Sequence, residues 1–261
     1  MALPFLELAC SKKATEQSAA EPFPLGMQLY SIASLLSQDF QGTIKTLAKA
    51  GYKKLEFAGP YYFSSQEERD NNVLLKFFGL KGSGYYDLKP NELKTFLDDL
   101  GLSAPSAHVS LQSLDENIEE VLNAAQIVGH QYIVCPMMVI STIEEYKTMA
   151  DKFNVIGEAC AKAGIRFGYH NHSLEFGARS GEIPMDVLLK RTDESLVSFE
   201  LDIFWTTVAG VDAVKYMTDY PGRFHLMHLK DMKSRMEKPD TDWETFTDTK
   251  RGQAISRMRQ T

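Results

Sequence analysis

The chain has 261 residues, a length that suits one large domain or two small ones. Hydrophobic residues make up 44% and charged residues 24%, the balance of a folded globular protein, which excludes a disordered or fibrous chain. No apolar run approaches the roughly 18 residues that cross a bilayer, so we expect no transmembrane segment. The formal net charge of -7 argues against nucleic acid as a partner, because Lys and Arg supply most of the affinity for phosphates.

Residues 1–24 differ in composition from the rest of the chain. A short apolar stretch is followed by a polar one that is rich in Ala, Ser and Glu and ends with two prolines, which is typical of a flexible linker. Ala9 followed by Cys10 resembles the end of a bacterial lipoprotein signal, although Glu7 stands where an aliphatic residue is usual. We therefore expect an export-signal remnant or a linker. An exported bacterial protein, periplasmic or lipid-anchored, is the first hypothesis and a cytoplasmic one the alternative.

Between residues 25 and 231, short apolar runs alternate with amphipathic segments of helical period. Predicted strands lie at 25–31, 53–59, 103–111, 131–139, 165–172, 196–204 and 224–231. Predicted helices lie at 40–50, 91–100, 114–128, 142–163, 185–191 and 212–220. A glycine, which readily adopts the left-handed conformation that ends a helix, follows four of these helices at positions 51, 101, 129 and 164.

This alternation predicts an α/β fold. A doubly wound open sheet usually carries a glycine-rich phosphate loop after its first strand, and the chain contains no such motif. A (β/α)₈ TIM barrel explains the alternation without that loop, and it places chemistry at the carboxyl ends of the strands. We therefore predict a barrel over residues 25–231, with seven recognisable strands.

The last stretch, 232–261, breaks the pattern. It is charged and polar and lacks an apolar run long enough for a buried strand. Its two glutamates, Glu237 and Glu244, stand in polar surroundings that favour a solvated loop. The sequence thus predicts an irregular tail with Trp243 exposed, and a barrel that is incomplete at the C-terminus, either by nature or by truncation. A missing eighth strand would leave an open sheet edge.

Residues 61–90 are long for a loop between a strand and a helix, and they include Tyr61, Tyr62, Phe63, Tyr85 and Tyr86. Aromatic faces stack well on sugars, and long loops at a barrel mouth often carry specificity. The alternative is a small helical insertion that packs on the barrel. The sequence leaves both open.

Polar side chains gather at the ends of the predicted strands, which converge on one mouth in a barrel. They are Gln28, Glu56, His108, His170, His172, Glu175, Asp202, His228, Lys230 and Asp231. A ring of carboxylates and imidazoles is costly to bury unless a cation or a substrate lies between them. Mixed nitrogen and oxygen ligands suit Mn²⁺, Co²⁺, Zn²⁺ or Fe²⁺ better than Ca²⁺.

Three segments here resemble the last strands of the xylose-isomerase-like TIM-barrel superfamily, which includes sugar phosphate isomerases and epimerases, inosose dehydratase and endonuclease IV. They are YHNHSLEF (169–176), SFELDIFW (198–205) and HLMHLKD (225–231). GMQLYS, GYKKLEFAG and GLSAPSAH are similar to the first three strands of its sugar-acting branch. The superfamily implies one divalent metal (Mn, Co, Zn, Fe or Mg). Its ligands are a Glu after strand five, an Asp after strand six, a His after strand seven and a Glu on strand eight.

Carried over to this chain, the resemblance implies Asp202 and His228 as metal ligands. Glu175 is the first choice for the third ligand and His170 the second, because relatives with a YHxH pattern take the carboxylate from the following loop. The implied substrate-binding residues are Gln28, His172, Trp205 and Lys230. Trp205 stands where ketose epimerases carry a substrate-contacting His, which argues against a simple ketose epimerase.

The leading functional hypothesis is a metal-dependent isomerase or epimerase that acts on a sugar or a sugar derivative, such as a sugar phosphate, through an enediolate. Its proton-transfer groups would come from Glu56, His108, His170 and Glu175. A lyase or dehydratase acting on an oxidised sugar or glycoside shares the first step and is the nearest alternative. A vestigial or sugar-binding barrel is a third possibility, and a nuclease would need a trinuclear cluster that the sequence lacks. The expected partner is a small carbohydrate, with a homo-oligomer possible.

Overall fold

The structure is a computed structural model that describes residues 26–231, apart from 73–74, 77–78, 81 and 139. The predicted export signal or linker and the predicted polar tail, with Trp243, Glu237 and Glu244, lie outside the described residues. Both therefore stay predictions, as does the localisation. No helix in the described part of the chain is long and apolar enough to cross a membrane.

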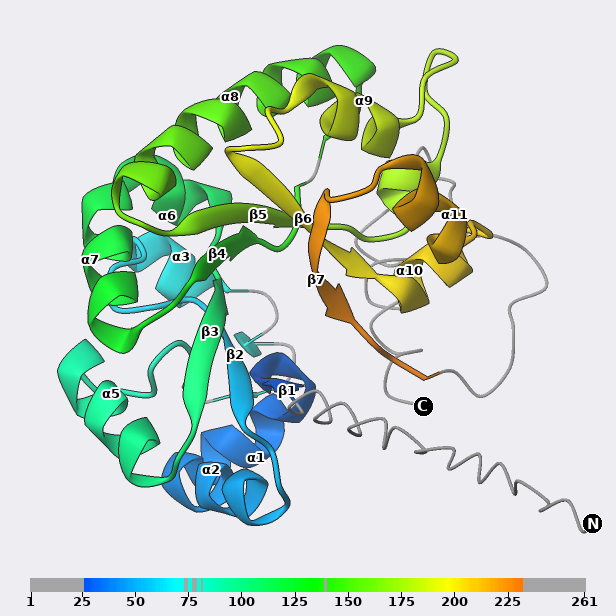
Figure 1. The fold of residues 1–261 in the computed structure, drawn as a ribbon. Coiled ribbons are helices and arrows are strands. Elements are labelled where there is room, and N and C mark those ends of the chain that lie inside the picture. Colours follow the sequence, from blue (N-terminus) through cyan, green and yellow to red (C-terminus); the bar gives the residue numbers. More distant parts are fainter. Residues whose placement is uncertain (1–25, 73–74, 77–78, 81, 139, 232–261) are drawn as a thin grey trace, which may run out of the picture.

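Seven strands form one parallel sheet, in which each strand pairs with its neighbours in sequence from β1 to β7. They are β1 (Gly26–Gln28), β2 (Lys54–Ala58), β3 (Ser103–His108), β4 (Tyr132–Cys135), β5 (Arg166–His170), β6 (Val197–Asp202) and β7 (Phe224–His228). Every predicted strand is confirmed, although each is shorter than its apolar run. The sheet curves into a half-barrel (Figure 1), with β1 and β7 as the edges of the described sheet.

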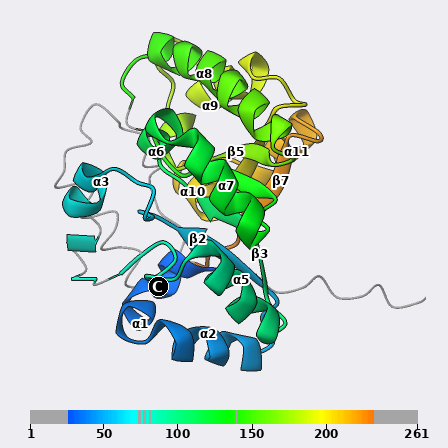
Figure 2. The same cartoon turned by 90° about the vertical axis from the view of Figure 1, so that its left-hand side faces the viewer.

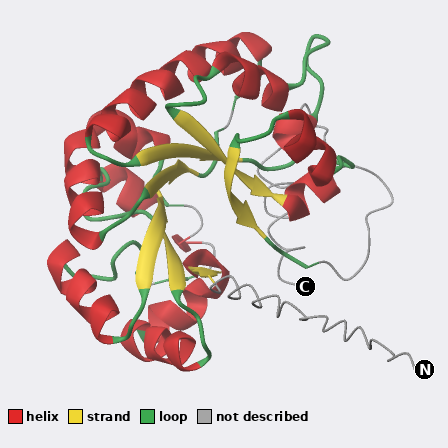
Figure 3. Ribbon diagram, viewed as in Figure 1, coloured by secondary structure: helices red, strands yellow, loops and turns green. Residues whose placement is uncertain are grey.

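Helices cover the outer face of this curved sheet, and the strands lie on the inside (Figures 2 and 3). In chain order they are η1 (Leu29–Ile32), α1 (Ala33–Gln38), α2 (Phe40–Lys49), α3 (Gln66–Asn71), α5 (Pro90–Asp99), α6 (Leu111–Glu116), α7 (Ile118–Val128), α8 (Ile143–Lys162), η2 (Leu174–Phe176), α9 (Pro184–Arg191), α10 (Ile203–Val208) and α11 (Ala213–Asp219). The longest, α8, begins with a capping box in which Thr142 and Glu145 satisfy each other's backbone amides.

One predicted helix is wrong in its boundaries. The segment 114–128 falls within two helices, α6 and α7, which are separated at Asn117. The side-chain amide of Asn117 donates to the carbonyl of Phe63 at 2.9 Å, a bond to a distant segment that no local periodicity reveals. The helices α1, α3, α6 and α10 have six residues each and are too short for a helical period to emerge.

The strands pack apolar side chains on their outer face, against the helices, and carry the polar side chains of the candidate site on their inner face. The outward rings of Tyr169 on β5 and Phe199 on β6 pack together, and Tyr169 also contacts Phe153 of α8, with all three side chains fully buried. Because successive side chains of a strand point to opposite faces, His170 and Glu200 face the inside of the half-barrel. The apolar helix–sheet core therefore leaves a polar interior.

The aromatic segment 61–90 matches the second of its two interpretations. Tyr61, Phe63 and Tyr85 are buried, with ring centroids 4.8–4.9 Å apart from Tyr61 to each of the other two. The short helix α3 lies between Phe63 and Tyr85 along the chain. Tyr62 stays half exposed. These rings thus serve mainly to pack an insertion against the barrel.

Candidate functional site

The register of the last three strands brings the candidate residues together. His170 of β5 is paired with Glu200 of β6, and Asp202 of β6 is paired with His228 of β7. All six residues of β6 are buried, and Asp202 is wholly inaccessible. Residues two apart on a strand share a face, so Glu200 and Asp202 present two carboxylates at successive depths of the same interior.

The deeper layer is a network of two carboxylates and two imidazoles. His108 Nε2 lies 2.7 Å from Glu200 Oε2 and 3.0 Å from Glu56 Oε1. His228 Nε2 lies 2.7 Å from the same Glu56 oxygen and 3.2 Å from Glu200 Oε2. Ser106 donates to the second oxygen of Glu56 at 2.7 Å. These groups come from four strands, β2, β3, β6 and β7, and meet inside the half-barrel.

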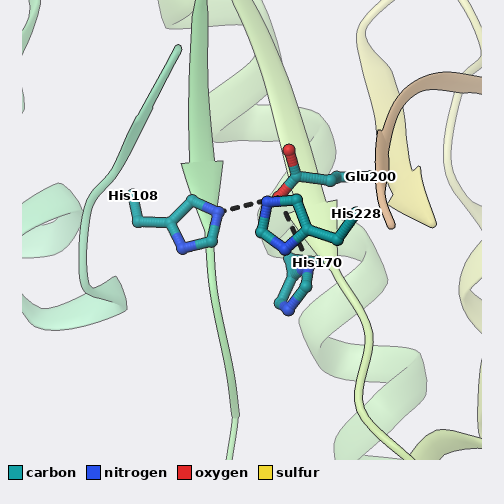
Figure 4. A group of neighbouring side chains, drawn as sticks. All are labelled: His108, His170, Glu200 and His228. Atoms are coloured by element: carbon teal, nitrogen blue, oxygen red, sulfur yellow. Dashed lines mark hydrogen bonds and ion pairs between the residues drawn. The ribbon is translucent and has the colours of Figure 1, made fainter. Parts of the chain in front are cut away.

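A metal ion could be held here. Ligand atoms of His108, His170, Glu200 and His228 all lie within 4.8 Å of one another, and all four residues are buried (Figure 4). Imidazole nitrogens with a carboxylate oxygen suit zinc and other divalent transition metals. The donor set fits such an ion without fixing which metal it is.

The layer nearer the mouth is centred on Asp202. Its Oδ2 lies 3.7 Å from His170 Nε2 and 3.7 Å from His228 Nδ1. Lys230 donates to the same oxygen at 2.6 Å, so an ammonium already balances the buried carboxylate. His228 Nδ1 is buried and has no hydrogen-bond partner among the described residues. Asp202 Oδ2, His170 Nε2 and His228 Nδ1 thus lie close to one another, and the carboxylate among them already attracts the positive charge of Lys230.

The loops after β5 and β6 lock Asp202 in place. Its Oδ1 accepts from the backbone N–H of Trp205 and caps helix α10 at 3.0 Å. Its own N–H donates to the side-chain oxygen of Asn171 at 3.0 Å. Because Oδ1 is engaged in this cap, Oδ2 is the oxygen that can bind a cation. It faces His170 and His228.

Electrostatics in the deeper layer hold His108 charged. Burial opposes its protonation, but the carboxylates of Glu56 and Glu200 outweigh this and raise the pKa of His108 to about 10. Burial and the charge of Glu56 raise the pKa of Glu200 to about 7, against the opposing effect of His108. The pKa of Glu56 lies well below its usual range, because His108 and His228 together outweigh its burial.

In the layer nearer the mouth, by contrast, two histidines are held neutral. Burial lowers the pKa values of His170 and His172 well below the usual range, so both rings are neutral and keep a lone pair. Burial likewise opposes charge on His228, yet the neighbouring carboxylates of Asp202, Glu56 and Glu200 raise its pKa to about 9. The pKa of Asp202 falls below its usual range: burial would raise it, but His228, Lys230 and His170 more than compensate.

Glu175 lies outside this group. Its Oε1 accepts from the Tyr169 hydroxyl at 2.6 Å and its Oε2 from the backbone N–H of His172 at 2.9 Å. The carboxylate is buried, with a raised pKa caused by desolvation. Both oxygens are thus engaged in holding the loop that follows β5. Its predicted ligand role stays untested, whereas His170, the second choice, lies beside Asp202 and His228.

The predicted substrate-binding residues divide into three kinds. His172 and Trp205 lie side by side, with ring centroids 5.2 Å apart. Each has a buried ring nitrogen for which the described residues supply no hydrogen-bond partner. Lys230 contacts Asp202. Gln28 instead accepts from the backbone N–H of Ser31 at 3.2 Å and caps the short helix η1.

Glu200 is the residue that sequence reasoning missed. It stands two positions before Asp202 on a strand whose apolar neighbours suggested only core. The period of two along a strand places it on the same face as Asp202, and that signal could have found it. By contrast, the predicted residues Glu56, His108, His170, Asp202 and His228 all meet inside the half-barrel, as expected.

Comparison with known proteins agrees with this architecture. The sequence profile of the xylose isomerase-like TIM barrel family matches residues 44–249. The chain belongs to this family. Family membership and the seven parallel strands of the half-barrel confirm the predicted fold class.

Curated relatives carry one name. An inosose dehydratase of Clostridium perfringens is 28% identical over 219 residues, covering 79% of this chain and 69% of the relative. An inosose dehydratase of Clostridium botulinum is 31% identical over 210 residues, covering 74% of this chain and 64% of the relative. The chain thus spans about two thirds of the length of these relatives.

Solved structures extend the likeness. A sugar phosphate isomerase/epimerase of Parabacteroides distasonis is 30% identical, with a TM-score of 0.68 and coverage of 85% of this chain and 81% of that chain. A structure of IOLI protein with a bound zinc atom has a TM-score of 0.59 at 13% identity, over 84% of this chain and 76% of that one, and shows likeness of fold alone. The relatives of this chain thus include proteins named as dehydratases and proteins named as sugar phosphate isomerases/epimerases.

Proposed function

We propose that this chain is a metal-dependent dehydratase that removes water from a polyhydroxylated ketone such as an inosose or an oxidised sugar. The observation that carries the proposal is the approach of His228 Nδ1 to Asp202 Oδ2 at 3.7 Å, beside a carboxylate–imidazole network. No described residue forms a hydrogen bond with this nitrogen. The names of the curated relatives favour dehydration over the isomerisation that the sequence first suggested.

Of the two groups of possible ligands, Asp202, His228 and His170 would hold the metal, because the charged imidazole of His108 in the deeper group has no lone pair to offer. Atoms bound to one ion at roughly 2 Å lie about 3–4 Å apart, and both histidine nitrogens lie 3.7 Å from Asp202 Oδ2. A bound divalent ion polarises a carbonyl and acidifies the adjacent C–H bond. Lys230, which meets Asp202 without the metal, would then be released toward substrate oxygens.

The chain's own residues would bind the substrate and move the proton. His172 and Trp205 each have a buried nitrogen that lacks a hydrogen-bond partner in the described structure, and a substrate hydroxyl would satisfy both. His108 is the group that we propose exchanges protons with the substrate, because the carboxylates of Glu56 and Glu200 stabilise its charged form. In this role the imidazolium of His108 protonates the departing hydroxyl. The Glu200 carboxylate, which lies 2.7 Å from His108 and has a pKa raised to about 7, would accept the proton from the C–H bond next to the carbonyl.

The test uses metal-loaded protein and an inosose in D₂O. We expect deuterium to enter at the carbon next to the carbonyl, and mass spectrometry to detect a product that has lost one water. The Asp202→Asn variant should do neither. The surface variant Glu158→Gln makes the same type of change at an exposed carboxylate that forms an ion pair with Lys162, and it should behave as wild type.

An isomerase or epimerase is the second candidate, supported by two structures of sugar phosphate isomerase/epimerase from Parabacteroides distasonis at 30% and 28% identity. That activity would give deuterium exchange with a product of unchanged mass apart from the label. Absence of exchange with both inosose and keto-sugars would refute both candidates and favour a barrel that only binds sugars.

A further inference from the structure

His228 presents its two ring nitrogens to two different carboxylates. Its Nε2 lies 2.7 Å from Glu56 Oε1, a hydrogen bond that joins residues 172 positions apart. Its Nδ1 is buried and lies 3.7 Å from Asp202 Oδ2, and within the described part of the chain it has no hydrogen-bond partner. The ring therefore spans the two layers of the site.

A neutral imidazole carries one N–H and one lone pair, and the hydrogen bond made by one nitrogen decides which nitrogen keeps the proton. Since the Glu56 carboxylate can only accept, the proton of a neutral His228 lies on Nε2. The lone pair then lies on Nδ1, on the side of Asp202. A metal ligand needs that lone pair, so the hydrogen bond selects the nitrogen that can bind.

Glu56 is itself fixed for this task. Its other oxygen accepts from Ser106 Oγ at 2.7 Å, and Ser106 is its register partner on the neighbouring strand β3. The side chain is 7% exposed. Glu200 also approaches His228 Nε2, but at 3.2 Å, and its shortest contact is with His108 at 2.7 Å. The carboxylate best placed to orient His228 is therefore that of Glu56.

We propose that Glu56 is a positioning residue, which fixes the Nε2–H tautomer of His228 and turns its Nδ1 lone pair toward Asp202 for a divalent metal. This inference rests on the metal site of the proposed function. It gives Glu56 a role other than the proton transfer that its place at a strand end first suggested.

The test compares zinc affinity in metal-stripped wild type and in Glu56→Gln, measured with a competing chromophoric chelator. Loss of a carboxylate partner of a ligating histidine weakens metal binding by about 10- to 100-fold, and we expect that range for Glu56→Gln. Ser106→Ala leaves the carboxylate but removes its anchor, and should weaken zinc binding by a smaller factor. Glu158→Gln is the matched surface control and should bind as wild type.

Nitrogen NMR of the zinc-loaded wild type gives a second readout that a merely structural role would not produce. We expect His228 to be bound through Nδ1 and to retain a proton on Nε2. Thermal melts check that each variant folds, and Ser106→Ala keeps the test open should Glu56→Gln not fold.

Two results would overturn the positioning role. One is equal zinc affinity in folded Glu56→Gln and in wild type, and the other is His228 bound to zinc through Nε2. Failure of the proposed function looks different, because wild type would then bind no zinc, or Asp202→Asn would bind it as tightly as wild type.

Discussion

The stability of the fold should depend on pH through His130, a buried histidine that is not part of the carboxylate–imidazole network. It lies between α7 and β4 and is 4% exposed. Its Nδ1 lies 2.6 Å from the Ala104 carbonyl, so Nδ1 carries the proton, and its Nε2 accepts from the Tyr85 hydroxyl at 3.0 Å. Burial lowers the pKa of His130 from 6.5 to about 4, outweighing the Ala104 hydrogen bond.

The direction of the effect depends on where each state binds the proton. The unfolded chain protonates this histidine near pH 6.5, whereas the folded chain resists until about pH 4. Stability is therefore complete above pH 6.5 and falls as the pH drops toward 4. The full difference corresponds to about 3 kcal/mol, of which about 2 kcal/mol is lost by pH 5, against a total stability of roughly 5–15 kcal/mol.

The assay is urea unfolding between pH 7.5 and pH 5 for wild type and His130→Gln. Other buried histidines shift stability in both proteins, so the difference between the two slopes isolates His130. We expect the variant to be less stable at pH 7.5 but to lose about 2 kcal/mol less over this range. His225→Gln, at an exposed position on β7, serves as the control and should keep the wild-type slope. If the free energy of unfolding of wild type and of His130→Gln changed equally with pH, His130 would not be the source of this pH dependence.

Three further predictions concern the site. Glu175→Gln should lower stability by about 1–3 kcal/mol, because the buried carboxylate of Glu175 holds the loop after β5. The variant should still bind one zinc. Loss of zinc by a folded variant would identify Glu175 as a ligand. His172→Ala should keep zinc affinity but raise KM for the keto substrate, and an unchanged KM would remove His172 from the substrate site. Zinc binding must displace a proton from His228, because its carboxylate neighbours raise its pKa to about 9 against the effect of burial. The affinity for zinc should therefore fall about tenfold for each pH unit below 9. Zinc titrations at pH 8 and pH 7 check this.

The strand pattern was readable from sequence because buried parallel strands are short apolar runs and the helices between them are amphipathic. Strand-end residues such as Asp202 and His228 followed from the same logic, since parallel strands bring their carboxyl ends together. The break at Asn117 was not readable, because it depends on a hydrogen bond to a distant carbonyl. Glu175 illustrates the same limit: its residue type suits a ligand, but tertiary hydrogen bonds engage both of its oxygens.

Asp202 and His228 are proposed to hold one catalytic divalent metal, and isothermal titration of metal-stripped protein with Zn²⁺ measures this binding. Wild type, Asp202→Asn and the surface control Glu158→Gln are titrated side by side. We expect one zinc bound per chain in wild type and in the control, and at least a hundredfold weaker binding in Asp202→Asn. A wild-type chain that binds no zinc, or an Asp202→Asn chain that binds it as tightly as wild type, would rule out this metal site.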